Sequence, residues 1–188
     1  MIIWHTTELV VLIDEYDTAI GTMPKSQVHS ATTPLHRAFS CFVFDHHWNI
    51  VLQQRAASKK TRPLVWSNSF CGHPSPDQSY EHAVVARWKY ELGIDILVDS
   101  VIKVCDYRYC FVRYWVMENE FCPIFIVYTD DTPIPNPYEV ASVIYMPWSQ
   151  RLHELHQDLP GDQWKRSEWC KEEAVLIKKR LNKENPPA

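Results

Sequence analysis

The stretch from Gly72 to Ile94 reads GHPSPDQSYEHAVVARWKYELGI, and it decides how the rest of the chain is organised. Its second half predicts a helix over residues 80–92. Apolar side chains recur in that half at helical spacing, at Val84, Trp88 and Leu92. Ser79 is a suitable N-cap, and Gly93 is the residue type that most often follows the last helical turn. One amphipathic helix is therefore expected near the middle of the chain.

The segments on either side of this helix alternate or are apolar throughout, which predicts strands. The expected strands cover residues 8–14, 36–45, 49–54, 96–104, 107–116, 120–128 and 139–146. Residues 21–34 have no clean period and are expected to form an ordered loop. The order of strands, one helix, further strands and terminal helices predicts an α+β fold with a mixed β-sheet between helices. We expect a single domain over 1–188, with its core at about 8–148 and C-terminal helices at about 149–183.

The composition limits the class of protein. The chain has 188 residues, 46% hydrophobic and 22% charged, which suits a globular domain with a full core. Its net charge of −4, without a long basic run, argues against nucleic acid as the primary partner. The six cysteines show no Cys-x-x-Cys pair, and the apolar run 9–13 is too short to span a membrane. A reduced, cytoplasmic protein is expected.

Two pairs of polar residues have spacings that could support chemistry. In the segment 68–74, NSFCGHP, Cys71 and His73 project to the same side if the chain is extended. Glu118 and Glu120 would likewise share one face of a strand, where two carboxylates repel unless a cation or a proton holds them. Taken singly, a buried cysteine beside a turn histidine and a solvated strand end are the more common explanations of these patterns.

Further histidines and basic residues could complete such a site. His29 and His36 flank a proline-containing stretch, so they could meet at a metal only through folding of the expected loop. A shared metal would then be the only strong tie that the sequence shows between that loop and the rest. Arg87 and Glu91 have the spacing of an ordinary helical ion pair. The basic residues that could surround a diphosphate are scattered and could equally be surface charges: Lys25, Arg55, Lys59, Lys60 and Arg87.

In their order and spacing, these segments resemble the type I isopentenyl-diphosphate isomerases of the Nudix superfamily. The resemblance runs from Gly21 to about Tyr128. It is carried by LHRAFS at 35–40, RAASKK at 55–60, WSNSFCGHP at 66–74, RWKYELG at 87–93 and ENE at 118–120. The segment 72–94 also has the spacing of a degenerate Nudix box. In that box, Gln78 and Arg87 stand where a pyrophosphohydrolase would usually have acidic residues.

The resemblance implies a Nudix-type fold and the interconversion of isopentenyl and dimethylallyl diphosphate through a carbocation, in isoprenoid biosynthesis. It also implies a site for Mn²⁺, Zn²⁺ or Mg²⁺ made of three imidazoles and two carboxylates. The residues that match these ligands are His29, His36, His73, Glu118 and Glu120. Glu91 matches the carboxylate that helps to hold a second cation, Mg²⁺, on the substrate diphosphate.

The same resemblance implies the roles of the remaining site residues. The diphosphate would be bound by Lys25, Arg55, Lys59 and Arg87. Glu120, assisted by the Tyr109 hydroxyl, would protonate C4 of the substrate, and Cys71 would remove a proton from C2. An aromatic face, assigned to Trp164, would stabilise the carbocation.

Two other functions stay open on the sequence alone. A Nudix pyrophosphohydrolase would need several helix carboxylates for its metals, and only Glu91 lies on the suitable face. A Nudix-fold binding module that has lost catalysis would not need Cys71, Glu118 and Glu120. The expected partner is a small isoprenoid diphosphate, not a nucleic acid or a membrane, and the expected assembly is a monomer or a weak homodimer.

Overall fold

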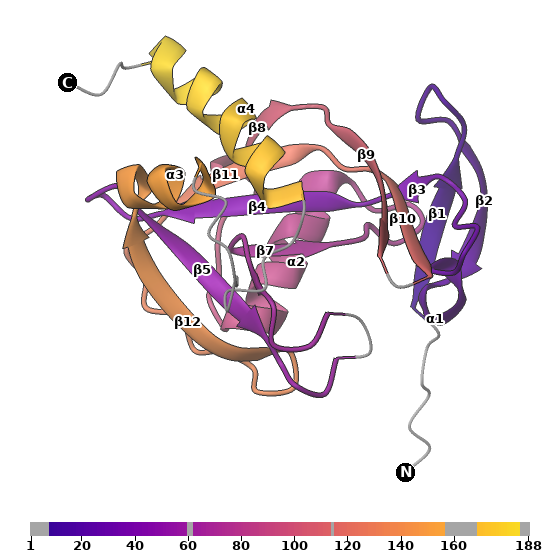
Figure 1. Ribbon diagram of the computed structural model, residues 1–188, viewed down its shortest axis with the longest axis horizontal. Coiled ribbons are helices and arrows are strands. Elements are labelled where there is room, and N and C mark those ends of the chain that lie inside the picture. Colours follow the sequence, from indigo (N-terminus) through magenta and orange to yellow (C-terminus); the bar gives the residue numbers. More distant parts are fainter. Residues whose placement is uncertain (1–7, 60–61, 114, 157–168, 185–188) are drawn as a thin grey trace.

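The central helix has the predicted bounds. In the computed structural model, which describes residues 8–59, 62–113, 115–156 and 169–184, this helix is α2, Tyr80–Leu92 (Figure 1). Ser79 Oγ accepts a hydrogen bond from the His82 amide, which caps the first turn. Gly93 ends the helix with a φ of 71°, and its amide donates to the Lys89 carbonyl. Both helix ends are therefore satisfied by the residue types that the sequence offers there.

The strands form two mixed sheets. The larger one has the order β12-β5-β4-β11-β8, with β6 on β5 and β7 on β4. Its strands are β4 (Phe39–Phe44), β5 (Asn49–Arg55), β6 (Trp66–Ser67), β7 (Phe70–Gly72), β8 (Ile102–Cys105), β11 (Ile124–Tyr128) and β12 (Val140–Pro147). Within this sheet β4 and β11 run parallel, and the other pairs are antiparallel.

The smaller sheet lies beside the larger one (Figure 1) and has the order β2-β1-β3-β10-β9. Its strands are β1 (Leu9–Ile13), β2 (Ala19–Pro24), β3 (His36–Arg37), β9 (Arg108–Arg113) and β10 (Val116–Phe121). The short strand β3 runs parallel to β10, and its residue His36 pairs with Glu120. This register brings an imidazole and a carboxylate together from distant parts of the chain.

Strand β4 explains how the larger sheet is packed. All six of its residues are buried, because both faces of the sheet are covered. Phe39, Cys41 and Val43 belong to the core that contains α2. Phe42 and Phe44 belong to the core on the other side, beneath α3 (Trp148–His156) and α4 (Trp169–Glu184). Figure 1 shows this sheet between α2 and the two C-terminal helices. Each fully buried side chain of this size contributes about 1.5–3 kcal/mol of hydrophobic stabilisation.

The α+β class with mixed sheets between helices is confirmed, but some predicted elements differ. The segment 96–104 contains a 3₁₀-helix, Val98–Ser100, before β8 begins. The segment 120–128 divides into β10 and β11 around Pro123, which has no amide hydrogen for a sheet.

The prediction of a loop over 21–34 was wrong. It contains most of β2 and the short helix α1, Lys25–Val28. β2 is an edge strand with mostly exposed side chains, so it has no apolar period to detect.

The N-terminal segment is also held by hydrogen bonds that the sequence did not reveal. β2 pairs with β1 along its length. Further on, the Met117 amide donates to the Ser30 carbonyl at 2.7 Å, and Thr33 Oγ1 donates to the Met117 carbonyl at 2.6 Å. A metal is therefore not the only tie between this segment and the rest, contrary to the expectation from sequence.

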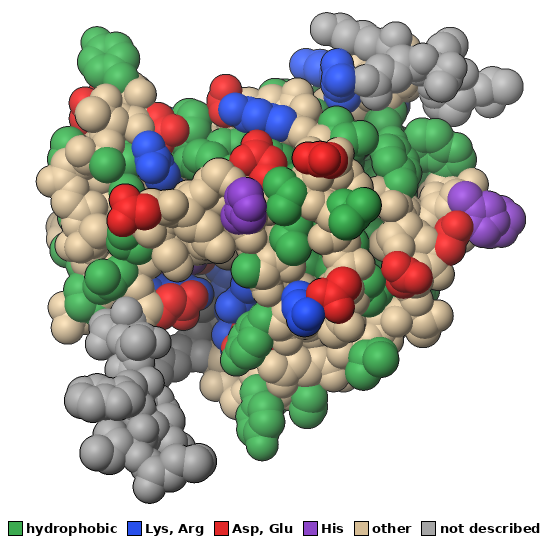
Figure 2. All heavy atoms as spheres, turned by 180° about the vertical axis from the view of Figure 1, so that it is seen from behind, with side chains coloured by type: hydrophobic (Ala, Val, Ile, Leu, Met, Phe, Trp, Pro, Cys, Tyr) green, Lys and Arg blue, Asp and Glu red, His purple; other side chains and the backbone are tan. Residues whose placement is uncertain are grey.

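On the face shown in Figure 2, acidic and basic side chains are interspersed with apolar ones. Within the described ranges, no helix is both long and apolar enough to cross a membrane.

Replacing Gly93 by Ala should lower the free energy of unfolding by about 1–3 kcal/mol, the usual cost of a strained backbone conformation. A Cβ at this position would lie 2.9 Å from the Ile134 carbonyl oxygen, and the φ of 71° is unfavourable for alanine. Gly21→Ala is the matched control, because nothing lies within 4 Å of the added Cβ. Urea denaturation of the two variants measures the difference. Equal stabilities would show that this helix end is not constrained.

Candidate active site

A cavity of about 740 Å³ is lined by residues of both sheets and of α1, α2 and α4. In Figure 2, basic side chains lie inside a recess of the surface, with acidic side chains at its edge. Most of the predicted site residues line the cavity, namely Lys25, His29, Arg55, Lys59, Cys71, His73, Arg87, Tyr109, Glu118 and Glu120. The structure thus brings together groups that the sequence separates by almost a hundred positions.

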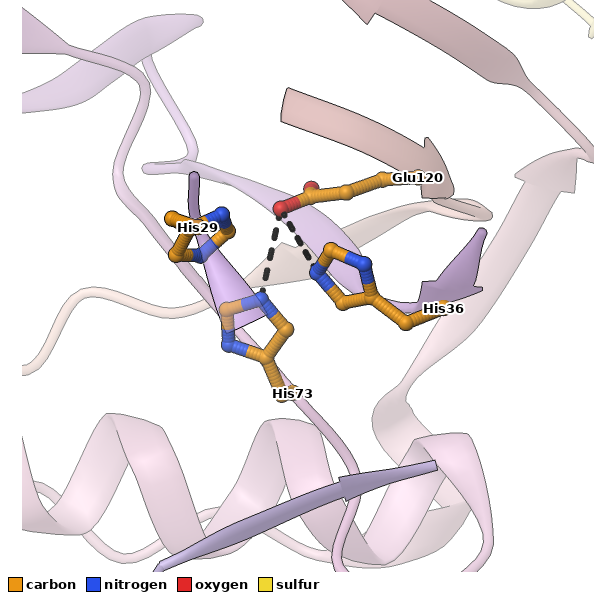
Figure 3. Close-up of side chains that lie close together, drawn as sticks. All are labelled: His29, His36, His73 and Glu120. Atoms are coloured by element: carbon orange, nitrogen blue, oxygen red, sulfur yellow. Dashed lines mark hydrogen bonds and ion pairs between the residues drawn. The ribbon is translucent and has the colours of Figure 1, made fainter. Parts of the chain in front are cut away.

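Four of the five predicted metal ligands converge on one point. One ligand atom from each of His29, His36, His73 and Glu120 lies within 4.8 Å of the others (Figure 3). They come from four places: the end of α1, the start of β3, the turn after β7, and β10. His73 Nε2 is 3.3 Å and His36 Nε2 is 3.4 Å from Glu120 Oε1. The group has the donor set of a divalent-metal site.

The hydrogen bonds of these rings suit a cation. His36 Nδ1 lies 2.9 Å from the Pro34 carbonyl, which can only accept, so this nitrogen carries the hydrogen. The Nε2 lone pair is then free to bind a metal, as is usual when a ligating histidine donates through its other nitrogen. Among the described residues, buried ring nitrogens of all three histidines lack a hydrogen-bond partner: His29 Nδ1, His36 Nε2 and His73 Nδ1. The residues present therefore fit a bound divalent cation.

The protonation states of His29, His73 and Glu120 agree with this reading, whereas in the absence of a cation His36 is drawn toward its charged form. Burial lowers the pKa of His73 to about 4 and also lowers the pKa of His29, which favours neutral imidazoles. Burial lowers the pKa of His36 too, but the Glu120 carboxylate, with Oε1 3.4 Å from Nε2, outweighs this and raises the pKa. Burial opposes ionisation of Glu120, yet His36 and His73 outweigh that effect and hold its pKa well below the usual range. Neutral imidazoles and ionised carboxylates are the forms that bind metals.

The structure does not bring Glu118 into this group. Both of its carboxylate oxygens accept hydrogen bonds from Arg62, from Nε and Nη2, each at 3.1 Å. The Arg62 guanidinium also lies 4.7 Å from the centre of the Trp169 ring. The sequence analysis missed Arg62, whose only signal was its position in a basic loop.

Three of the predicted diphosphate ligands, Lys25, Lys59 and Arg87, are paired with carboxylates at the cavity wall. Lys25 Nζ lies 2.7 Å from Glu8, and Lys59 Nζ lies 2.7 Å from Glu139. Arg87 pairs with Glu139 at 2.7 Å, and its Nε lies 2.5 Å from Glu91. The sequence had pointed to neither Glu8 nor Glu139, which have no motif and are recognised only by these ion pairs.

Lys25 and Glu91 differ in how readily they could bind an added ligand. Burial lowers the pKa of Lys25, and the positive charge of Arg87 acts in the same direction, so an added anion would be favourable there. Glu91 is buried and accepts hydrogen bonds from both Gln53 and Arg87. Its oxygens are therefore already engaged by protein groups.

The groups expected to carry protons lie on the two sheets. Cys71 is half-buried on β7, and burial raises the pKa of its thiol to about 12, although Arg55 opposes this. The Tyr109 hydroxyl on β9 donates a hydrogen bond to Glu120 Oε2. The ring of Trp169 stacks on the Tyr109 ring at 5.5 Å and 10° and lines the cavity. Trp169 was missed, because one tryptophan among eight in a weakly patterned tail carried no distinguishing signal.

Trp164, to which the aromatic role was assigned, lies outside the described residues. Its assignment stays a prediction.

Comparison with known proteins agrees with the geometry. The family model for the NUDIX domain matches residues 34–170. An isopentenyl-diphosphate Delta-isomerase of Kocuria rhizophila is 47% identical over 72% of this chain and 76% of its own length. One of Mycolicibacterium vanbaalenii is 40% identical over 92% of both chains. The chain belongs to the isopentenyl-diphosphate Delta-isomerase family.

Solved structures support the fold of this isomerase family member. A crystal structure of a Deinococcus radiodurans protein matches with a TM-score of 0.67 at 18% identity, over 89% of this chain and 98% of that one. A MutT protein of Methanosarcina mazei matches with a TM-score of 0.60 at 15% identity, over 82% of this chain and 97% of that one. At such identities the likeness concerns the fold alone.

Removing divalent cations with a chelator should speed hydrogen exchange of residues 25–33, while β2 keeps the protection given by β1. Loss of the cation should also lower the free energy of unfolding, by ~2.7 kcal/mol if the cation had been present at a hundred times its Kd. His29→Ala should reproduce the local effect without chelator. His46→Ala is the control, because the His46 side chain is exposed, does not belong to the ligand cluster and pairs with Asp130. Unchanged exchange after verified loss of the metal would contradict the four-ligand site.

Proposed function

We propose that this protein interconverts isopentenyl diphosphate and dimethylallyl diphosphate. One observation carries the proposal: a thiol, a tyrosine-supported carboxylate and a group of metal ligands share one cavity with a cluster of cations. The family relationship supports the same activity, because curated relatives over most of the chain carry that name. A hydrolase would have no use for a thiol at Cys71 in the same cavity as this carboxylate.

The cations bind and orient the diphosphate. Lys25, Lys59 and Arg87 lie at one wall of the cavity, where carboxylates now hold them in place. Arg55 also lines the cavity. A diphosphate would compete with Glu8 and Glu139 for these groups, and Arg87 can offer it two parallel N–H donors. Fixing the charged end in this way holds the five-carbon end against the catalytic groups.

Protonation of the alkene is assigned to Glu120. As a carboxylic acid, supported by the Tyr109 hydroxyl, it would deliver its proton to C4 and leave a tertiary carbocation at C3. Cys71, as the thiolate, would accept the proton from C2, and the electrons of that C–H bond would form the new double bond. The indole of Trp169 lies on the cavity wall and can stabilise the cation through its ring face.

The two groups exchange protonation states in each turnover. After the forward reaction Glu120 is ionised and Cys71 is a thiol. Without substrate, the lowered pKa of Glu120 and the raised pKa of Cys71 favour the same two forms. The same forms begin the reverse reaction, from dimethylallyl to isopentenyl diphosphate. A forward cycle therefore requires a proton to return to Glu120 and another to leave Cys71.

Two bound cations complete the proposal. His29, His36, His73 and Glu120 would hold one, with Glu118 as a further ligand if it leaves Arg62. A cation at this site would lower the proton affinity of the carboxyl group and would order the ligand loops. The mixed nitrogen and oxygen donors suit Mn²⁺, Zn²⁺ or Mg²⁺. Glu91 is proposed to support Mg²⁺ on the diphosphate.

The proposed activity also implies a substrate class, a cellular compartment and a state of assembly. The substrate is proposed to be a small isoprenoid diphosphate in isoprenoid biosynthesis. The protein is proposed to act in the cytoplasm as a monomer or a weak homodimer.

Purified protein with Mg²⁺ should convert isopentenyl diphosphate to dimethylallyl diphosphate without releasing phosphate or pyrophosphate. In deuterated water, substrate and product should gain deuterium at C4 and C2, because Glu120 and Cys71 exchange their protons with solvent. NMR of the organic products and a phosphate assay measure both outcomes. Release of phosphate or pyrophosphate without an allylic isomer would establish a hydrolase instead, and binding with neither product would establish a binding module.

Cys71→Ala should lower kcat by ~10²–10⁴-fold, the usual contribution of a positioned acid or base. Metal content and thermal stability should stay near those of the unaltered protein, because the substitution removes a single half-buried sulfur atom. Cys110→Ala is the matched control, since Cys110 is exposed and does not line the cavity. Near-normal turnover by Cys71→Ala would refute the role given to this thiol.

A further inference from the structure

Helix α4 carries a carboxyl group, Glu173, into the protein interior, and the chemistry proposed above does not use it. Its side chain is 0% exposed. Ser40 Oγ on β4 donates to Glu173 Oε2 at 2.9 Å, while Oε1 has no hydrogen-bond partner among the described residues. The charged side chains that act on it most strongly are both acidic, Glu120 and Glu172. An ionised carboxylate in this position would lose its hydration, with the Ser40 hydrogen bond as the main compensation.

The hydrogen bond to Ser40 is the first link of a buried network. The links run in the order Glu173–Ser40, Ser40–Asn68, Asn68–Ser67 and Ser67–Cys170. Their lengths are 2.9, 2.6, 2.7 and 3.7 Å, the last one to a sulfur atom. All five residues are at most 3% exposed. The network therefore leaves α4, passes through the larger sheet, and returns to α4.

This network reaches both walls of the cavity. Asn68 Nδ2 also donates to the Phe70 carbonyl at 2.9 Å, directly before Cys71, and Cys71 pairs with Ser40 in the sheet. On the helix side, Trp169 lies one turn before Glu173 and lines the same cavity. Through its stacking on Tyr109, Trp169 is connected to the carboxylate on the other sheet.

We propose that Glu173 is a positioning residue, present as the neutral carboxylic acid, whose network fixes Trp169 and Cys71 relative to each other across the cavity. The effect of Glu173 on turnover rests on the proposed isomerase function. The neutral acid and the network rest on the geometry of α4 and the larger sheet.

The electrostatic surroundings support a neutral acid. Burial raises the pKa of Glu173 well above its usual range; the Ser40 hydrogen bond opposes this, and the negative charges of Glu120 and Glu172 add to it. The ionisable groups that influence it or are influenced by it are all acidic: Glu120, Glu172, Tyr107, Cys71, Cys105 and Cys122. The two carboxylates, Glu120 and Glu172, disfavour a further negative charge in the interior, and the thiols and the phenol offer no positive charge that would favour one.

Turnover of two variants tests the positioning role. Glu173→Gln keeps the size and the hydrogen-bonding of the neutral acid, so its kcat should stay within roughly threefold of the unaltered value. Glu173→Ala removes the link to Ser40, and its kcat should fall about tenfold or more, because small displacements of catalytic groups are costly. KM should change little, since the basic side chains proposed to bind the diphosphate lie elsewhere in the cavity. Glu172→Gln, the exposed neighbour, is the control for charge removal on α4. Equal turnover of the Gln and Ala variants would overturn the role.

Thermal stability tests the neutral state without reference to turnover. In the folded protein Glu173 keeps its proton to a higher pH than in the unfolded chain, where it ionises at about pH 4.3. The stability contribution that is present below that pH is therefore lost as the pH rises toward the raised pKa. The Tm of the unaltered protein minus that of Glu173→Gln should decrease between about pH 4.5 and pH 8. The other acids are common to both proteins and cancel in this difference.

Parallel curves of Tm against pH would show that Glu173 is ionised in the folded protein and would overturn the proposal. This outcome is distinguishable from failure of the isomerase function. If the protein binds or hydrolyses a diphosphate without isomerising it, a falling Tm difference still supports the neutral acid and its network.

Discussion

The pairing of His36 with Glu120 is the constraint on which the site depends. The parallel register of β3 and β10 places an imidazole and a carboxylate side by side, both almost without exposure. Neither group is stable there alone, because a buried charge needs a partner and a buried ring nitrogen needs a donor or an acceptor. His29 and His73 complete the surroundings, and a divalent cation would satisfy the nitrogens that remain. The segments that carry these histidines therefore meet at one carboxylate, that of Glu120.

The same principle governs the other end of the cavity. Three basic residues, Lys25, Lys59 and Arg87, are held by carboxylates of the wall. Paired charges of this kind keep long side chains in defined positions before a substrate arrives, which reduces the entropy lost on binding. These ion pairs also oppose binding, because a diphosphate must displace the wall carboxylates from the basic side chains that would bind it. The affinity for substrate is then a balance between two sets of ion pairs.

What could be predicted from sequence follows from how local each signal is. Helix α2 was predicted with both of its ends, because capping and apolar spacing are properties of neighbouring residues. The histidines and Glu120 were identified through a resemblance carried by short motifs. Arg62, Glu139 and Trp169 could not be found in this way, since their importance arises only from contacts made in three dimensions. β2 was missed for a related reason: an exposed edge strand has no pattern of burial.

Strand β4 has one more consequence, for cooperativity. Its successive side chains belong alternately to the core under α2 and to the core under α3 and α4. A slip of one residue in its pairing would turn Ser40 away from Glu173 and toward α2, and would exchange the two sets of apolar side chains at once. The two cores thus share strand β4, which contributes side chains to both. They should unfold together as one unit, so that α4 is not an appendage that can detach while the larger sheet stays intact.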